Sequence, residues 1–173
     1  KYTKQEIMQQ IAGVVALAGA WSGDKVGLIL FSDHVEHMIA PRKGNFHVHH
    51  IVETIFSYKS PNKKTDINAL CDFIVSKSLK KANCLIVSDF IALDFSAGIK
   101  KIASKQNVIA IHCADLKEEA LEDVGLVWMQ DLETEKKILV NTRHGYQSLL
   151  SKNLQDRAKD QKIMLQSLGV EVV

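Results

Sequence analysis

Asn83-Cys84-Leu85-Ile86-Val87-Ser88-Asp89-Phe90 is the stretch that decides the fold of this 173-residue chain. Its three central apolar residues, two of them β-branched, stand between helical patterns and run into Ser-Asp. Such a run is typical of a strand buried on both faces of a parallel sheet. Ligands of these sheets collect at the carboxyl ends of the strands, so Asp89 is a candidate binding residue. Thr65, which opens the preceding helix, is its expected companion.

Strands and helices alternate along most of the chain, which predicts a doubly wound, mostly parallel α/β sheet with right-handed crossovers. Buried strands are expected at Val26–Phe31, Cys84–Ser88 and Val108–Cys113. An antiparallel edge strand is expected at Val35–Ile39, halted by Pro41 and Gly44. Helices are expected from His47 to Phe56, from Asp66 to Leu79, and around Phe95, Ile99 and Ile102. The residues expected on the inner faces of the first two are Val48, Ile51, Val52, Ile55, Ile67, Leu70, Cys71 and Ile74.

The first helix begins at Thr3-Lys4-Gln5-Glu6, which has the spacing of a capping box, and ends at Ser22-Gly23-Asp24. Its apolar stripe is predicted to pack on the sheet and consists of Ile7, Ile11, Val14, Ala18 and Trp21. We expect Trp21 to be buried against the strand Val26–Phe31. Trp21→Ala would then lower the free energy of unfolding by roughly 3–5 kcal/mol.

The C-terminal third has a different pattern. Leu126–Gln130 and Lys137–Asn141 flank a polar segment, which predicts a β-hairpin. A long helix is expected from Tyr146 to Leu168, capped by Gly169, with a final strand over Val170–Val173. No linker or repeat is visible, so residues 1–173 are interpreted as a single domain. Because the chain begins at Lys1 rather than methionine, we expect it to be a fragment.

Composition limits the classes of function. A net charge of +2 is too small to indicate nucleic acid as the partner. Three cysteines without zinc-type spacing, Cys71, Cys84 and Cys113, indicate reduced core residues and a cytoplasmic location. The sequence shows no signal peptide and no apolar stretch near the ~20 residues of a membrane span. Motifs of nucleotide-binding loops, nucleophile elbows and zinc proteases are also missing, so we predict that the chain is not an enzyme.

Five ordered segments carry a resemblance to a known family. They are residues 22–33, Pro41–Gly44, Thr65–Ile67, Ser88–Phe90 and Asp123–Val127. In order and distance they resemble the bacterial von Willebrand factor A-like proteins of domain of unknown function 58, which are typically encoded beside MoxR-type AAA+ ATPases. The resemblance implies a von Willebrand factor A-like, Rossmann-like fold and a non-enzymatic module that docks protein partners, with a MoxR-type ATPase among them.

The resemblance also implies a metal-ion-dependent adhesion site for Mg²⁺. Thr65 matches the family's threonine ligand and Asp89 matches its later aspartate ligand. The family's Asp-x-Ser-x-Ser loop is absent from the sequence and would precede Lys1. One hydroxyl and one carboxylate leave most of the octahedral positions of Mg²⁺ to water or a partner, so weak or absent metal binding is expected.

Other interpretations of these residues stay open. Thr65 could cap the following helix, and Asp89 could cap a helix or accept hydrogen bonds in a turn. Asp89 could also serve a phosphotransfer or phosphatase-like protein, and the domain could be structural with a degenerate metal site. Asp33 is predicted to act in a tight turn. The cluster from His47 to His50 is interpreted as a solvated helix start rather than a zinc site.

The family's first strand would lie between Val26–Phe31 and Cys84–Ser88 and would precede Lys1. Without it, the facing backbone groups would be buried unpaired, at roughly 1–3 kcal/mol each. We therefore expect that this position is not left empty. Residues before Lys1 fill it, a strand from elsewhere fills it, or the two flanking strands pair directly. An unfilled position would contradict the proposed strand order.

Overall fold

The described part of the chain contains three small sheets in a mixed α/β arrangement. The structure, a computed structural model, describes residues 3–61, 64–77, 80–90, 94–113, 125–130, 137–141, 156 and 159–173. A parallel sheet has the order β3 (Asn83–Ser88), β4 (Asn107–His112) and β7 (Glu171–Val172). An antiparallel pair is formed by β1 (Val26–Phe31) and β2 (Val35–Arg42). A second antiparallel pair is formed by β5 (Leu126–Gln130) and β6 (Lys137–Asn141).

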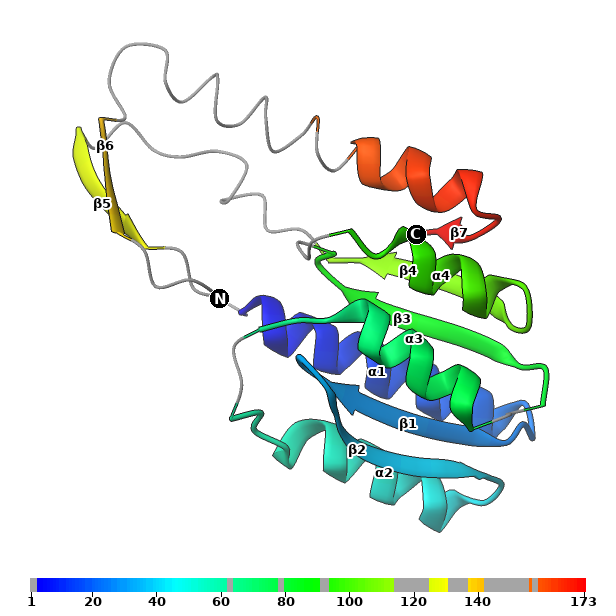
Figure 1. The fold of residues 1–173 in the computed structure, drawn as a ribbon. Coiled ribbons are helices and arrows are strands. Elements are labelled where there is room, and N and C mark those ends of the chain that lie inside the picture. The colour runs from blue at the N-terminus through cyan, green and yellow to red at the C-terminus, as the bar shows by residue number, and fades with distance from the viewer. Residues whose placement is uncertain are drawn as a thin grey trace.

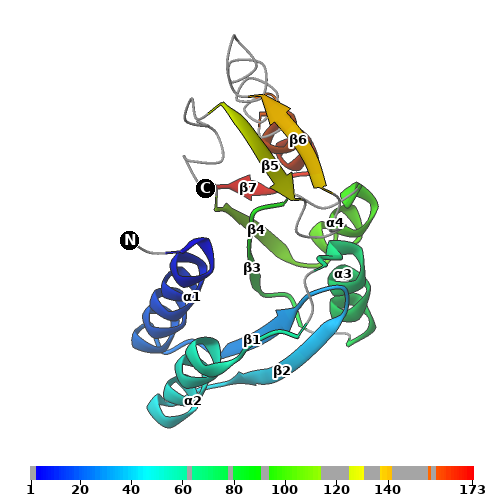
Figure 2. The ribbon, with the colours of Figure 1, turned by 90° about the vertical axis from the view of Figure 1, so that its left-hand side faces the viewer.

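Helices cover both sides of the strands of the body (Figure 2). One side carries α1 (Lys4–Trp21) and α2 (Asn45–Ser57), and the other carries α3 (Ile67–Ser76) and α4 (Ser96–Ala103). A further helix over residues 159–167 leads into β7. In Figure 1 the arrows of β1, β3 and β4 point the same way, so their carboxyl ends lie at one edge of the body. Within the described ranges, no helix has the length and apolar character needed to cross a membrane.

The main core lies between α3, α4, the parallel sheet and helix 159–167. It buries the predicted inner residues of α3 and the predicted Phe95, Ile99 and Ile102. Leu165 from helix 159–167 joins them at 1% exposure. The predicted apolar faces of α3 and α4 are thus confirmed. They follow from the spacing, because apolar residues three and four positions apart share one helix face. The same rule holds for α2, where Val48, Ile51 and Ile55 are buried as predicted.

The predicted orientation of α1 is wrong. Trp21 is 85% exposed and Val14 is 66% exposed, while the buried residues of this helix are Gly13 and Ala16. The small residues face α2, where Ala16 joins the second core cluster with Val48, Ile51 and Ile55. Small side chains let two helix backbones approach closely, so α1 uses its alanine and glycine face against α2. The apolar stripe that includes Trp21 lies outside this contact.

Several boundaries differ from the sequence prediction in ways that have local causes. β2 continues through Pro41 to Arg42, which pairs with Val26, because an edge strand tolerates a residue without an N–H group. The capping box at Thr3 and Glu6 is confirmed, and Gly23 ends the first helix at φ 75°. The antiparallel pairing of β5 with β6 is confirmed at the predicted residues, and the predicted turn between them lies outside the described residues. Of the predicted helix from Tyr146 to Leu168, residues 146–155 and 157–158 lie outside the described residues, and Gly169 caps its end at φ 78°.

The described residues do not form a single continuous doubly wound sheet. β1 and β3 belong to different sheets, and no strand in the described ranges is hydrogen-bonded between them. Direct pairing of these two strands, one of the three expected solutions, is therefore wrong. Their unpaired facing edges count against the proposed strand order within this chain. Helix α1 contacts both strands and thereby joins the two sheets.

Candidate docking site at the carboxyl edge

Asp89 lies directly after β3, at the carboxyl edge, as the strand pattern predicts. Its backbone is held by β4, because His112 Nε2 lies 3.1 Å from the Asp89 carbonyl oxygen. A carbonyl oxygen can only accept, so this ring nitrogen carries the proton and donates. The neighbouring Cys113 N–H donates to the Ser88 carbonyl oxygen at 2.9 Å. These two contacts fix the direction in which the chain leaves β3.

The next residue, Phe90, has a left-handed backbone with φ 52°. Among the residues that the structure describes, no other residue except glycine has a positive φ. Such a conformation costs about 1–3 kcal/mol of conformational free energy. Two hydrogen bonds hold it: its N–H donates to Ser88 Oγ at 3.1 Å, and Gln161 Nε2 donates to its carbonyl oxygen at 2.6 Å. The turn that carries Asp89 is therefore held by contacts from β3, β4 and helix 159–167.

Lys4 is a charged neighbour of Asp89 at this edge. Its Nζ lies 3.2 Å from Asp89 Oδ2, and the two side chains are 20% and 29% exposed. Lys4 begins α1, so the capping box at Thr3 and Glu6 sets its place. The pKa of the Cys113 thiol reports the local field: burial and the charge of Asp89 raise it, and Lys4 opposes them. Sequence reasoning missed Lys4, because no motif marks a lone lysine at a helix start.

Thr65 lies at the same edge, next to the end of β1. The N–H of the following Asp66 donates to the Ser32 carbonyl oxygen at 2.8 Å, which ties this segment to the end of β1. Asp66, not Thr65, is the N-cap of α3, because its side chain accepts a hydrogen bond from Ala69 N–H at 3.0 Å. The capping interpretation of Thr65 is therefore wrong. That Thr65 and Asp89 hold one metal ion together stays a prediction.

The described residues at this edge do not by themselves fit a resident Mg²⁺ ion. This ion prefers near-octahedral coordination by oxygen and usually keeps several waters beside one or two carboxylate ligands. The edge offers the Asp89 carboxylate and the Thr65 hydroxyl, and the Lys4 ammonium already lies against that carboxylate. Within the described ranges, no three histidine, cysteine or acidic side chains gather where a metal could be held.

The remaining polar candidates have local roles. Asp33 accepts hydrogen bonds from Ser32 Oγ at 3.1 Å and from His34 Nδ1 at 2.6 Å, so the turn prediction is confirmed. The hydrogen bond from His34 is the main cause that lowers the pKa of this carboxyl. His47 is not simply solvated, because its Nε2 lies 2.8 Å from the Val26 carbonyl oxygen. It connects the start of α2 to β1.

Comparison with known proteins gives a family and a fold. Residues 1–162 match the family described as "Protein of unknown function DUF58". The uncharacterised proteins Rv1480 of Mycobacterium tuberculosis and Mb1516 of Mycobacterium bovis are each 23% identical over 134 residues, which is 76% of this chain. The chain spans 42% of the length of these relatives.

Two solved structures are also similar. One is an aerotolerance-related membrane protein from Bacteroides fragilis, with a TM-score of 0.54 and 14% identity. That match covers 95% of this chain and 88% of the other. The second is the conserved hypothetical protein BatB from Bacteroides thetaiotaomicron, with a TM-score of 0.49, 10% identity and coverage of 94% and 88%. At these identities the first likeness concerns the fold alone.

Proposed function

This chain belongs to the DUF58 family, and we propose that it is a non-enzymatic module that docks a partner protein at the carboxyl edge of its strands. The observation that carries the proposal is the partly exposed pair of Lys4 and Asp89, fixed at the edge where open α/β sheets bind their ligands. We also propose that this edge binds partners as in von Willebrand factor A-like proteins. This part of the proposal rests on the five segments of the sequence that resemble that family.

The chemistry of the edge favours an acidic group on the partner. Lys4 supplies an ammonium that a partner's aspartate or glutamate can share with Asp89, and Thr65 supplies a hydroxyl donor. A hydrogen bond to a charged group contributes about 1.5–3 kcal/mol when it is well formed. Because Lys4 and Asp89 remain 20% and 29% exposed, the lower part of that range applies. Such a contact gives selectivity for an acidic surface more than high affinity.

The metal-dependent form of the proposal needs oxygen donors beyond Thr65 and Asp89. We therefore propose Mg²⁺ binding for a chain extended at its N-terminus through a further strand and loop, and weak or no binding for this chain. Calorimetric titration with Mg²⁺ or Mn²⁺ compares the two. The metal-dependent form is excluded when the extended chain shows no binding that Asp89→Ala removes.

A MoxR-type AAA+ ATPase is the proposed partner, on the basis of the family resemblance. The test measures binding of a purified MoxR-type ATPase to the wild-type chain and to Lys4→Gln. The matched control is Lys101→Gln, since Lys101 also pairs with an aspartate, Asp72, at 2.8 Å. We expect Lys4→Gln to bind about tenfold more weakly, which corresponds to the loss of one charge-assisted contact with the partner's carboxylate. Equal binding by Lys4→Gln and Lys101→Gln would refute docking at this edge.

Phosphotransfer through Asp89 is the alternative of another class. Incubation with acetyl phosphate followed by mass spectrometry separates the two, because a phosphotransfer protein gains a phosphoryl group on Asp89 and a docking module does not. A chain that binds neither the ATPase nor an acidic peptide, and takes up no phosphoryl group, would be the structural domain with a degenerate site. A cytoplasmic location is proposed from the three free cysteines, and cell fractionation tests it.

A further inference from the structure

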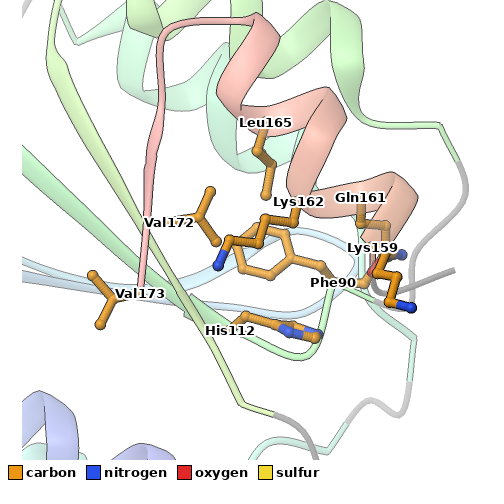
Figure 3. A pocket seen from close by; sticks show the side chains of 8 residues that line it. All are labelled: Phe90, His112, Lys159, Gln161, Lys162, Leu165, Val172 and Val173. Carbon is orange, nitrogen blue, oxygen red and sulfur yellow. Dashed lines mark hydrogen bonds between the residues drawn. The ribbon is translucent and has the colours of Figure 1, made fainter. Parts of the chain in front are cut away.

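We propose that a pocket between helix 159–167 and the ends of β4 and β7 binds a small organic carboxylate. The pocket has a volume of about 240 Å³ and is lined in part by Phe90, His112, Lys162 and Val172 (Figure 3). Its described lining includes neither Asp89 nor Lys4, the pair of the docking edge. This site goes beyond the proposed docking function and does not depend on it.

The charge of the lining selects an anion. Lys159 and Lys162 both line the pocket, and their three-residue spacing puts them on one face of the helix. Among the described residues, the lining includes no aspartate or glutamate side chain. Within the described residues, neither ammonium has an ion-pair or hydrogen-bond partner. Two unpaired cations beside an apolar wall are the arrangement that a carboxylate would complete.

The rest of the lining selects an apolar body. Phe90 and Leu165 back the pocket and are 0% and 1% exposed, so the apolar surface that a ligand can touch comes from the half-buried Val172 and the exposed Val173. In Figure 3 the nitrogen of Lys162 lies on the side of Val172. A ligand that touches the valine side chains can therefore place its charge at Lys162. The volume is below the roughly 300 Å³ at which pockets for drug-sized ligands begin, so a single ring or a short chain fits.

The backbone of Phe90 is an independent observation that points to the same place. Its φ of 52° is unfavourable for a bulky residue, and strained residues of this kind cluster at binding sites. Gln161, from the helix that carries both lysines, donates to the Phe90 carbonyl oxygen at 2.6 Å. The His112 ring lies 6.1 Å from the Phe90 ring, centroid to centroid. The Phe90 ring that backs the pocket is therefore held in one position before any ligand arrives, which lowers the entropic cost of binding.

The test is an NMR titration of the isotopically labelled chain with three probes. Benzoate carries both a ring and a charge, benzamide carries the ring alone, and acetate carries the charge alone. We expect saturable benzoate shifts at the amides of Phe90 and His112, with affinity at least about fivefold higher than for either other probe. Lys162→Met should weaken benzoate binding about fivefold, while Lys162→Arg should retain most of it, because arginine keeps the charge.

Lys100→Met is the matched control, since Lys100 is an exposed helical lysine on α4, outside this pocket. It should change benzoate affinity less than about twofold, and urea denaturation should show that both methionine variants remain folded. The proposal is overturned by any of three results: no saturable shift with benzoate, equal affinity for benzamide, or equal benzoate affinity for Lys162→Met and Lys100→Met. If Lys162 only covers apolar surface with its stem, Lys162→Met will keep the wild-type affinity and produce the third result.

Discussion

Gly98→Ala tests the close packing of α3 against α4. A methyl group built at Gly98 would lie 2.6 Å from Asn68 Oδ1, 3.0 Å from Cys71 Cβ and 3.1 Å from Asn68 Cα. The Gly98 N–H also donates to Asn68 Oδ1 at 3.0 Å, so the amide side chain cannot move away without losing that bond. Two of the three close neighbours belong to rigid parts of α3. The helices must therefore separate to admit the methyl group.

The size of the effect follows from two opposed contributions. Replacing glycine by alanine inside a helix stabilises it by up to about 1 kcal/mol. Overpacking a close contact costs about 1–3 kcal/mol, and loss of the bond to Asn68 would add about 0.5–1.5 kcal/mol. We expect the packing cost to exceed the propensity gain, so Gly98→Ala should lower the free energy of unfolding by about 1–3 kcal/mol.

Gly13→Ala is the matched control for this substitution. A methyl group at Gly13 would meet Phe56 Cε2 at 3.4 Å and Phe56 Cζ at 3.8 Å, which is close to ordinary contact. The propensity gain should dominate there, and the variant should be as stable as the wild type or about 0.5–1 kcal/mol more stable. Urea denaturation followed by far-ultraviolet circular dichroism measures both. If Gly98→Ala proves as stable as Gly13→Ala, the packing of α3 on α4 has been misinterpreted.

Four further predictions concern other parts of the molecule. Trp21→Ala should change the free energy of unfolding by less than about 0.5 kcal/mol, because the side chain is 85% exposed, and a loss of several kcal/mol in urea would contradict that exposure. Asp66→Ala should cost about 1 kcal/mol by removing the N-cap of α3, with Asp66→Ser retaining most of the stability. Burial raises the pKa of Cys71 to about 12, so with rising pH the thiol loses its proton in the unfolded state before it does in the folded state. The free energy of unfolding should therefore fall as pH rises above about 8.5, and it should fall less steeply with pH in Cys71→Ala. Amides on the facing edges of β1 and β3 should exchange hydrogen faster in this chain than in one extended at its N-terminus, and equal rates would exclude a strand from that extension between them.

Periodicity predicted the buried faces of α3 and α4 because both helices pack against the main core. In α3, the residues Ile67, Leu70, Cys71 and Ile74 are all buried, as their three- and four-residue spacing requires. The same reasoning failed for α1, whose apolar residues have helical spacing but do not all face the core. Spacing shows which apolar residues share a face but not what that face meets. The alanine and glycine face of α1 packs against α2 because it allows a closer approach, and Trp21 is exposed to solvent.

The candidate site shows the same division between local and long-range information. Asp89 could be found from the sequence because the end of a buried parallel strand is a local signal. Its pairing with Lys4 joins residues 85 positions apart, and only the packing of α1 across β1 and β3 brings them together. The left-handed turn at Phe90 has a local contact to Ser88 Oγ, but its second stabilising contact comes from Gln161, 71 positions later in the chain. Both features depend on elements that meet only in the fold, so a substitution in α1 or helix 159–167 can alter the surroundings of Asp89 without touching its own strand.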